Sequence, residues 1–156
     1  GMYERYHHDV VGVNSRLDSI QAAILDIKLK HLDYYNNSRK KSALKYTELL
    51  KNHKNIITPM VLGDEDSHVF HQYTLIIKDA DRDELVKYLN QNQIPCGVYY
   101  PIPLHQQKAY QNDKYEEKDF EVTNSLSKSV ISLPMHTELD DEQVEFICEK
   151  IIKFLK

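Results

Sequence analysis

The longest regular pattern in the sequence is a helical one that covers residues 15–52. Near its start, apolar side chains follow one another at spacings of three and four: Leu17, Ile20, Ile24 and Ile27. This spacing places them on one face of an amphipathic α-helix. Because the period continues less regularly to Leu50, we expect either one long helix or two abutting helices bent between residues 31 and 37. A helix of this length in a small domain needs another element to cover its apolar face.

The remainder of the chain alternates between strand-like and helical patterns. Runs of β-branched and aromatic residues predict strands within three segments: 70–78, 94–100 and 130–134. Further helices are expected to begin near three residues: Asp81, Phe120 and Asp140. Each of the two aspartates is followed three residues later by Glu or Gln, the pattern of a capping box. Together these elements predict an α+β fold, in which a long N-terminal helix precedes a small, mainly antiparallel sheet covered by helices.

Length and charge limit the number of domains and the kinds of partner. The chain has 156 residues, the size of one domain rather than two. Residues 1–14 are polar and aromatic without a helical period, so we interpret them as an extended lead-in to a single domain over residues 15–156. The net charge is -4 and the basic and acidic residues are interspersed, so we expect no nucleic-acid partner.

Cysteine spacing and hydropathy indicate the compartment. Cys96 and Cys148 lie far apart and form no C-x-x-C pair, which favours reduced thiols over a disulfide or a metal site. The sequence has no signal peptide and no run of about 18 apolar residues that could cross a membrane. We therefore expect a cytoplasmic protein with no membrane partner.

The sequence offers no metal site and no nucleotide-binding loop. His68 and His71 form an H-x-x-H pair at the expected start of a strand, where residues three apart point to opposite faces. No Cys or His set has the spacing of a structural zinc site. The chain has only four glycines, and neither a dinucleotide fingerprint nor a Walker motif is present.

The segment from Gly12 to Asp18 has two interpretations. Asn14 and Arg16 stand just ahead of a predicted helix start, where backbone amides and a guanidinium both favour an anion. Alternatively, Asn14 or Ser15 caps the helix and Arg16 pairs with Asp18. Spacing alone favours the capping interpretation.

A second segment, residues 99–105, also has two interpretations. Tyr99, Tyr100 and His105 lie at the end of a predicted strand that Pro101 and Pro103 stiffen. Rigid prolines could hold these rings toward a ligand. Equally, this is an edge strand that ends at prolines, with its tyrosines packed.

Taken in order, these segments resemble one family. The string Gly12-x-Asn14-x-Arg16-Leu17 followed by Ile20-Gln21-Ala22-Ala23-Ile24-Leu25 resembles the helix-start motif of the DegT/DnrJ/EryC1/StrS sugar aminotransferases. Further motifs match that family in the same order: Asn37-x-Arg39, Ala43-x-x-Tyr46, His71-Gln72-Tyr73, Tyr100-Pro101-x-Pro103-Leu104-His105 and Ser132-Leu133-Pro134-Met135. The resemblance extends from Tyr6 to the last helix, essentially the whole chain.

The resemblance implies a function and a set of site residues. It implies the C-terminal domain of a fold type I enzyme that depends on pyridoxal 5'-phosphate (PLP) and transfers an amino group from glutamate to a nucleotide-linked keto sugar. Asn14 matches an asparagine that reaches the PLP phosphate of the neighbouring subunit in a homodimer. Arg16 matches an arginine beside the substrate, and Tyr99 and Tyr100 match a pair that lies against the nucleotide sugar.

The sequence departs from the family at the cofactor. The family's Schiff-base lysine belongs to its large domain, and none of the lysines here matches the motif around it. An exposed helix lysine does not provide the desolvated amine that covalent PLP catalysis needs. We therefore assign no catalytic residue and expect this chain alone to bind no PLP. The alternative is a stand-alone assembly module that dimerises or completes a separately encoded large domain.

Overall fold

The computed structural model describes residues 2–63, 67–111 and 114–156. Two strands form an N-terminal hairpin: β1 (Met2–Glu4) and β2 (His7–His8). The elements after it are α1 (Ser19–Leu29), α2 (Leu32–Leu50), β3 (Ile56–Ile57), β4 (Tyr73–Ile77), α3 (Arg82–Gln91), α4 (Glu121–Ser129), β5 (Val130–Leu133) and α5 (Asp141–Phe154). Three short 3-10 turns precede α4: η1 (Leu104–Gln106), η2 (Lys108–Tyr110) and η3 (Glu117–Phe120).

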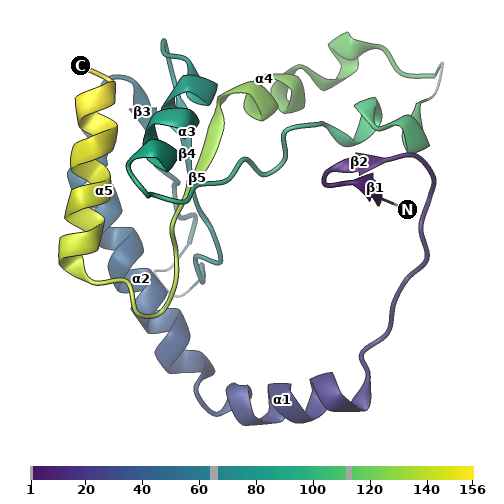
Figure 1. The fold of residues 1–156 in the computed structure, drawn as a ribbon, viewed down its shortest axis with the longest axis horizontal. Helices are drawn as coiled ribbons and strands as arrows, with labels where there is room; N and C mark the ends of the chain where they lie inside the picture. The colour runs from purple at the N-terminus through teal and green to yellow at the C-terminus, as the bar shows by residue number, and fades with distance from the viewer. Residues whose placement is uncertain (1, 64–66, 112–113) are drawn as a thin grey trace.

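A three-stranded antiparallel sheet forms the centre of the domain, in the order β3-β4-β5. The β4–β5 register pairs Tyr73 with Leu133 and Ile76 with Val130. Every residue of β5 is buried, as are alternate residues of β4. In Figure 1, α5 lies along α2, and α3 lies close to the sheet. The α+β class with a small antiparallel sheet and covering helices is therefore confirmed.

The core is built from the apolar faces of α2, α3, β4, β5 and α5. Its largest fully buried side chains include two tyrosines, Tyr46 of α2 and Tyr73 of β4, whose rings stack with centroids 4.9 Å apart. Tyr46 Oη donates to the carbonyl oxygen of Pro134 at 3.1 Å. Both phenols are therefore part of the core packing, which explains two of the chain's many tyrosines without a binding role.

Helices α3 and α5 begin where the sequence predicts. Asp140 Oδ1 accepts from Gln143 N at 2.8 Å, and Gln143 Oε1 accepts from Asp140 N, so the capping box before α5 is confirmed. Asp81 Oδ1 accepts from the amides of the first turn of α3. There the Glu84 carboxylate accepts from Lys87 Nζ at 2.6 Å.

The prediction of one long N-terminal helix is wrong. The helical segment divides at Lys30 and His31 into α1 and α2, so the alternative of two abutting helices is the one observed, with the break at the very start of the expected bend. His31 has non-helical angles of φ -112° and ψ 4°. The physical reason is packing: α2 lies against α5, whereas α1 buries none of its residues.

Two strand predictions also need correction. The strand expected at residues 94–100 is reduced to a single bridge between Gly97 and Ser132. Flanking prolines at 95 and 101 cannot donate to a ladder, which limits the pairing. Conversely, the connector expected at residues 52–63 contains β3, in which Ile56 pairs with Ile77.

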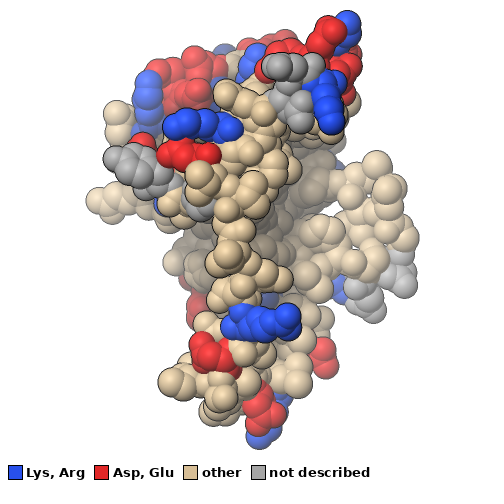
Figure 2. All heavy atoms as spheres, turned by 90° about the vertical axis from the view of Figure 1, so that its right-hand side faces the viewer, with Lys and Arg blue, Asp and Glu red and all other residues tan. Residues whose placement is uncertain are grey.

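The N-terminal part reaches away from the core. Residues 9–18 run along the right-hand side of Figure 1 and join the hairpin to α1, which lies at the bottom. Figure 2 shows this side of the molecule: charged side chains gather in its upper and lower parts, and the stretch between them is mostly uncharged. None of the helices in the described part of the chain is both long and apolar enough to span a membrane.

Candidate functional site

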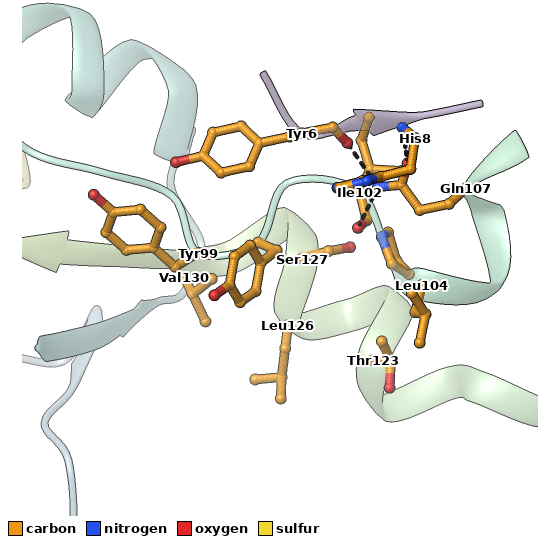
Figure 3. A pocket seen from close by; sticks show the side chains of 12 residues that line it. Tyr6, His8, Tyr99, Ile102, Leu104, Gln107, Thr123, Leu126, Ser127 and Val130 are labelled. Atoms are coloured by element: carbon orange, nitrogen blue, oxygen red, sulfur yellow. Dashed lines mark hydrogen bonds between the residues drawn. The ribbon is translucent and has the colours of Figure 1, made fainter. Parts of the chain in front are cut away.

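A cavity of about 550 Å³ lies between the N-terminal hairpin, the segment 99–107 and α4. Its lining includes three tyrosines, Tyr6, Tyr99 and Tyr100, together with apolar side chains such as Leu104 and Leu126. Figure 3 shows Tyr6 above Tyr99, with both phenol rings pointing the same way. The volume is in the range of small-molecule sites. We call this space the tyrosine cavity.

Pairing with the sheet edge positions Tyr99. Gly97 N donates to Ser132 O at 3.0 Å, and Ser132 N donates to Gly97 O at 2.7 Å. A Cβ added at Gly97 would lie 2.7 Å from atoms of the Tyr99 ring. The ring can therefore lie over the backbone of residue 97 only because that residue is glycine.

Tyr6 enters the cavity from the hairpin, almost 100 residues away in the sequence. Its ring is edge-on to Tyr99 and to Tyr100, with centroids 6.4 Å and 6.1 Å apart. Edge-to-face rings at these separations attract one another. Sequence reasoning missed Tyr6, because it lies in a segment with no periodic pattern. The available signal was that the family resemblance begins at this residue.

The predicted site residues are divided between two places. Tyr99 and Tyr100 line the tyrosine cavity, as the ligand-facing interpretation of their segment requires, and a cis peptide bond joins them. Asn14 and Arg16 do not line it: both are exposed on the segment between the hairpin and α1. These four residues remain predicted binding residues.

The interpretation that Asn14 or Ser15 caps the first helix is wrong. The helix begins at Ser19, and Asp18 Oδ1 accepts from Gln21 N at 2.8 Å. Asp18 takes the cap position because its carboxylate reaches the first free amides of α1. Asn14 and Arg16 are thereby left four and two residues ahead of the cap, on backbone outside any helix.

His105 turns away from the tyrosine cavity. Its ring stacks on Phe120 with centroids 4.1 Å apart, and its Nε2 lies 3.7 Å from Glu117 Oε2. The expectation that this imidazole could face a ligand together with the phenols is wrong for this cavity. The stacking instead attaches the loop after Pro103 to η3.

A second cavity of about 410 Å³ adjoins the first, because Tyr99 lines both. It includes His71, His136 and half-buried Cys96. His71 and His68 are both exposed, and His68 Nδ1 accepts from Phe70 N at 2.9 Å. Across residues 2–63, 67–111 and 114–156, no three Cys, His, Asp or Glu side chains are grouped to hold a metal.

The tyrosine cavity carries no acidic or basic side chain among the described residues that line it, apart from the imidazole of His8. In particular it has no lysine. The partly buried Lys45 lies on α2 outside this cavity, where its Nζ pairs with Glu145 Oε1 of α5 at 2.7 Å. The described lining of the tyrosine cavity is therefore mainly aromatic and apolar, with His8 as its titratable side chain.

The sequence matches known proteins along its whole length. Residues 1–152 match the DegT/DnrJ/EryC1/StrS aminotransferase family. A pleiotropic regulatory protein of Geobacillus stearothermophilus is 42% identical over 100% of this chain and 42% of its own length. A UDP-N-acetyl-3-dehydro-alpha-D-glucosamine 3-aminotransferase of Acidithiobacillus ferrooxidans is 38% identical over 99% of this chain and 40% of its own length.

Solved structures show the same relationship. DesV of S. venezuelae, solved with a ketimine intermediate, superposes with a TM-score of 0.82 at 31% identity, covering 100% of this chain and 41% of DesV. An aminotransferase from Brucella abortus has a TM-score of 0.78 at 35% identity, over 92% of this chain and 37% of its own. The chain thus spans about two-fifths of the length of these relatives. By sequence and by fold, the chain belongs to the DegT/DnrJ/EryC1/StrS aminotransferase family.

Proposed function

We propose that this chain is the C-terminal small domain of a PLP-dependent nucleotide-sugar aminotransferase, and that its tyrosine cavity forms one wall of the substrate site. The observation that carries the proposal is the convergence of Tyr99, Tyr100 and Tyr6 on one uncharged cavity in a member of this family. Aromatic rings suit the apolar faces of sugars and bases. Relatives that act on dTDP- and UDP-linked sugars support this substrate class.

The rest of the enzyme supplies the cofactor in this proposal. PLP acts as the electron sink for amino transfer from glutamate to the keto sugar. This chain offers no lysine for it, so catalysis belongs to the intact homodimer. Asn14 and Arg16 act across the subunit interface, on the PLP phosphate and on the substrate respectively. Their exposure on the segment before α1 suits contact with another chain.

Borohydride reduction in the presence of PLP tests the cofactor part. We expect the chain alone to form no stoichiometric adduct at any single lysine and to show no aminotransferase activity. An intact relative treated in the same way is the control, and it should give one reduced lysine adduct. A single stoichiometric adduct on this chain would contradict the proposal.

Binding of dTDP-glucose and UDP-N-acetylglucosamine tests the substrate wall. Tyr100→Ala should weaken binding by about tenfold, the effect of losing one well-placed aromatic contact. Tyr34→Ala is the matched control, because Tyr34 is 66% exposed and Tyr100 is 67% exposed, yet Tyr34 lies on α2 outside the cavity. Equal effects of the two substitutions would remove the tyrosine cavity from the proposal.

The exposed face of α1 favours a second role, assembly with a large domain on another chain. No residue of α1 is buried, although Ile20 and Ile27 are 76% and 63% exposed and lie on one face of it. Soluble proteins rarely leave such a continuous apolar patch uncovered. In this role α1 and the adjoining segment would be the surface that the large domain covers.

Sedimentation with a co-expressed large domain of a close relative tests the assembly role. Ile20→Lys combined with Ile24→Lys should abolish the complex, because both charges would face an apolar surface. Met60→Lys is the control, since Met60 is 77% exposed on a loop distant in sequence from α1. A complex that survives the double substitution would exclude α1 as the contact.

A further inference from the structure

The side-chain amide of Gln107 joins the N-terminal hairpin to the loop that carries the tyrosines. Its Nε2 donates to the Tyr6 carbonyl oxygen at 2.7 Å, and its Oε1 accepts from His8 N at 2.9 Å. Figure 3 shows both bonds at the edge of the tyrosine cavity. Gln107 is only 7% exposed, so these bonds are shielded from water. Because a carbonyl can only accept and an amide N–H can only donate, the two partners also determine which way the Gln107 amide points.

We call these two hydrogen bonds of Gln107 the clamp. The turn that they hold has a backbone conformation that is costly for Tyr6. Tyr6 has a φ of 70°, in the left-handed region that a residue with a Cβ rarely adopts. Such a conformation persists only where surrounding contacts over-determine it. Gln107 bonds to the carbonyl oxygen of Tyr6 and to the amide of His8, so it fixes the backbone that directly follows Tyr6. The clamp therefore holds Tyr6 where its ring meets Tyr99 and Tyr100.

Besides Gln107, the rings of Tyr99 and Tyr100 and one exposed ion pair contact the N-terminal segment. Its strands have three and two residues, and an isolated two-stranded hairpin of this size is marginal in water. Lys108 Nζ pairs with Asp9 Oδ1 at 3.0 Å, but the lysine side chain is 72% exposed and such pairs contribute little. The buried amide of Gln107 is consequently the principal anchor between the hairpin and η2.

We propose that Gln107 is a positioning residue that seats the hairpin as the roof of the tyrosine cavity, and that Tyr6 is thereby a third substrate-binding tyrosine. The clamp is a property of this chain alone, whereas the ligand contact of Tyr6 rests on the proposed function. Because no Lys, Arg, Asp or Glu occurs among the described lining residues, the cavity accepts an uncharged ring of the nucleotide sugar. The diphosphate stays outside it.

Amide hydrogen exchange of the chain without ligand tests the clamp. Gln107→Glu keeps the shape of the side chain but replaces its donor with an acceptor that faces the Tyr6 carbonyl. We expect the His8 amide to exchange about tenfold faster in Gln107→Ala, the effect of losing a shielded hydrogen bond. The increase should be smaller in Gln107→Glu, because its carboxylate still accepts from the His8 amide but repels the Tyr6 carbonyl oxygen. The amides of the β4–β5 ladder should keep their protection, which shows that the variants fold.

Gln106→Ala is the matched control. Gln106 is the exposed neighbour of Gln107, and its Nε2 contacts Glu117 and Asn124 rather than the hairpin. We expect its His8 amide to exchange at the wild-type rate. Unchanged His8 exchange in both Gln107 variants would overturn the clamp, whatever the ligand does.

Binding of dTDP-glucose and UDP-N-acetylglucosamine tests the role of Tyr6. Tyr6→Ala and Gln107→Glu should each raise Kd by about tenfold, and in the intact enzyme they should raise KM while leaving kcat nearly unchanged. Tyr6→Phe should restore most of the affinity, since it keeps the ring. Wild-type affinity in Tyr6→Ala would overturn the roof role. If the unmodified intact enzyme binds neither probe, the proposed function fails together with the ligand contact, while the clamp is still judged by the exchange rates.

Discussion

Arg82 Nη1 donates a 2.6 Å hydrogen bond to the carbonyl oxygen of Val130. The same guanidinium donates through Nη2 to Ser127 O at 3.1 Å, so it joins the start of α3 to the end of α4. Arg82 is 8% exposed, and its Nε pairs with Asp83 Oδ1 at 2.6 Å. The orientation of α4, which forms one side of the tyrosine cavity, therefore depends on this buried cation.

We expect Arg82→Ala to lower the free energy of unfolding by about 3 kcal/mol, because two buried carbonyls lose a charged donor. Urea unfolding followed by circular dichroism measures the change. Lys87→Ala on the same helix is the control, since its pair with Glu84 is exposed and its removal should leave the urea midpoint unchanged. Equal midpoints for wild type and Arg82→Ala would contradict this account.

Stability should fall in alkali because of Tyr73. Burial raises the pKa of Tyr73 to about 12, whereas the phenol of an unfolded chain titrates near its ordinary value of about 10. Between these pH values the unfolded chain loses the proton and the folded chain keeps it. This phenol therefore destabilises the folded state progressively as pH rises, by about 2–3 kcal/mol. Burial raises the pKa of Tyr46 and of Cys148 as well, so their contributions add to that of Tyr73.

Unfolding of Tyr73→Phe across pH 9 to 12 isolates this contribution. The Tyr73 hydroxyl is 2.8 Å from Thr47 Oγ1, which itself donates to Ala43 O, so the phenol is the donor. Its loss should lower stability by about 1 kcal/mol at neutral pH and flatten the alkaline slope. Tyr34→Phe, at an exposed position, should leave that slope unchanged. Parallel slopes for wild type and Tyr73→Phe would contradict the prediction.

Gly97→Ala should displace the ring of Tyr99 without unfolding the domain. The new methyl group would lie 2.7 Å from the ring, and the phi angle of Gly97 does not require glycine. We expect shifted Tyr99 ring resonances and weaker binding of nucleotide sugars, by roughly tenfold. Gly63→Ala offers the opposite control: its φ of 102° predicts a stability loss of about 1 kcal/mol with binding unchanged. Unchanged Tyr99 resonances in Gly97→Ala would count against the close packing.

The two thiols should differ in reactivity. Burial raises the pKa of Cys148 to about 12, so at pH 8 only roughly one thiol in ten thousand is ionised. Cys96 is half-buried, and burial raises its pKa as well. We expect iodoacetamide to label Cys96 slowly in the folded chain and Cys148 only after unfolding in urea, as mass spectrometry can follow. Native Cys96→Ser should take up no label, and rapid labelling of that variant would contradict the burial of Cys148.

Local sequence patterns were sufficient for the elements whose signals are local. Asp81 and Asp140 mark the starts of α3 and α5, because a cap involves only residues within one helical turn. The strands at residues 73–77 and 130–133 were also predicted, since β-branched residues there alternate or cluster as buried strands do. Family motifs further indicated Tyr99 and Tyr100, and both line the cavity.

Long-range contacts decided the rest. Whether Ile56 or Gly97 joins the sheet depends on a partner strand about 20 to 35 residues away. The break between α1 and α2 depends on which half finds a helix to pack against. The spacing of apolar residues along the sequence could reveal neither the sheet partners nor this break.

The sequence by itself determined the fold class, the starts of α3 and α5 and the family, because periodicity, caps and ordered motifs are written in neighbouring residues. Only the tertiary structure decided the shape of the candidate site. Tyr6 and Gln107 lie 101 residues apart, and their hydrogen bond forms because folding brings the hairpin to the loop after Pro103. A pairing between distant residues leaves no pattern in a single sequence, since either residue alone is compatible with many other partners.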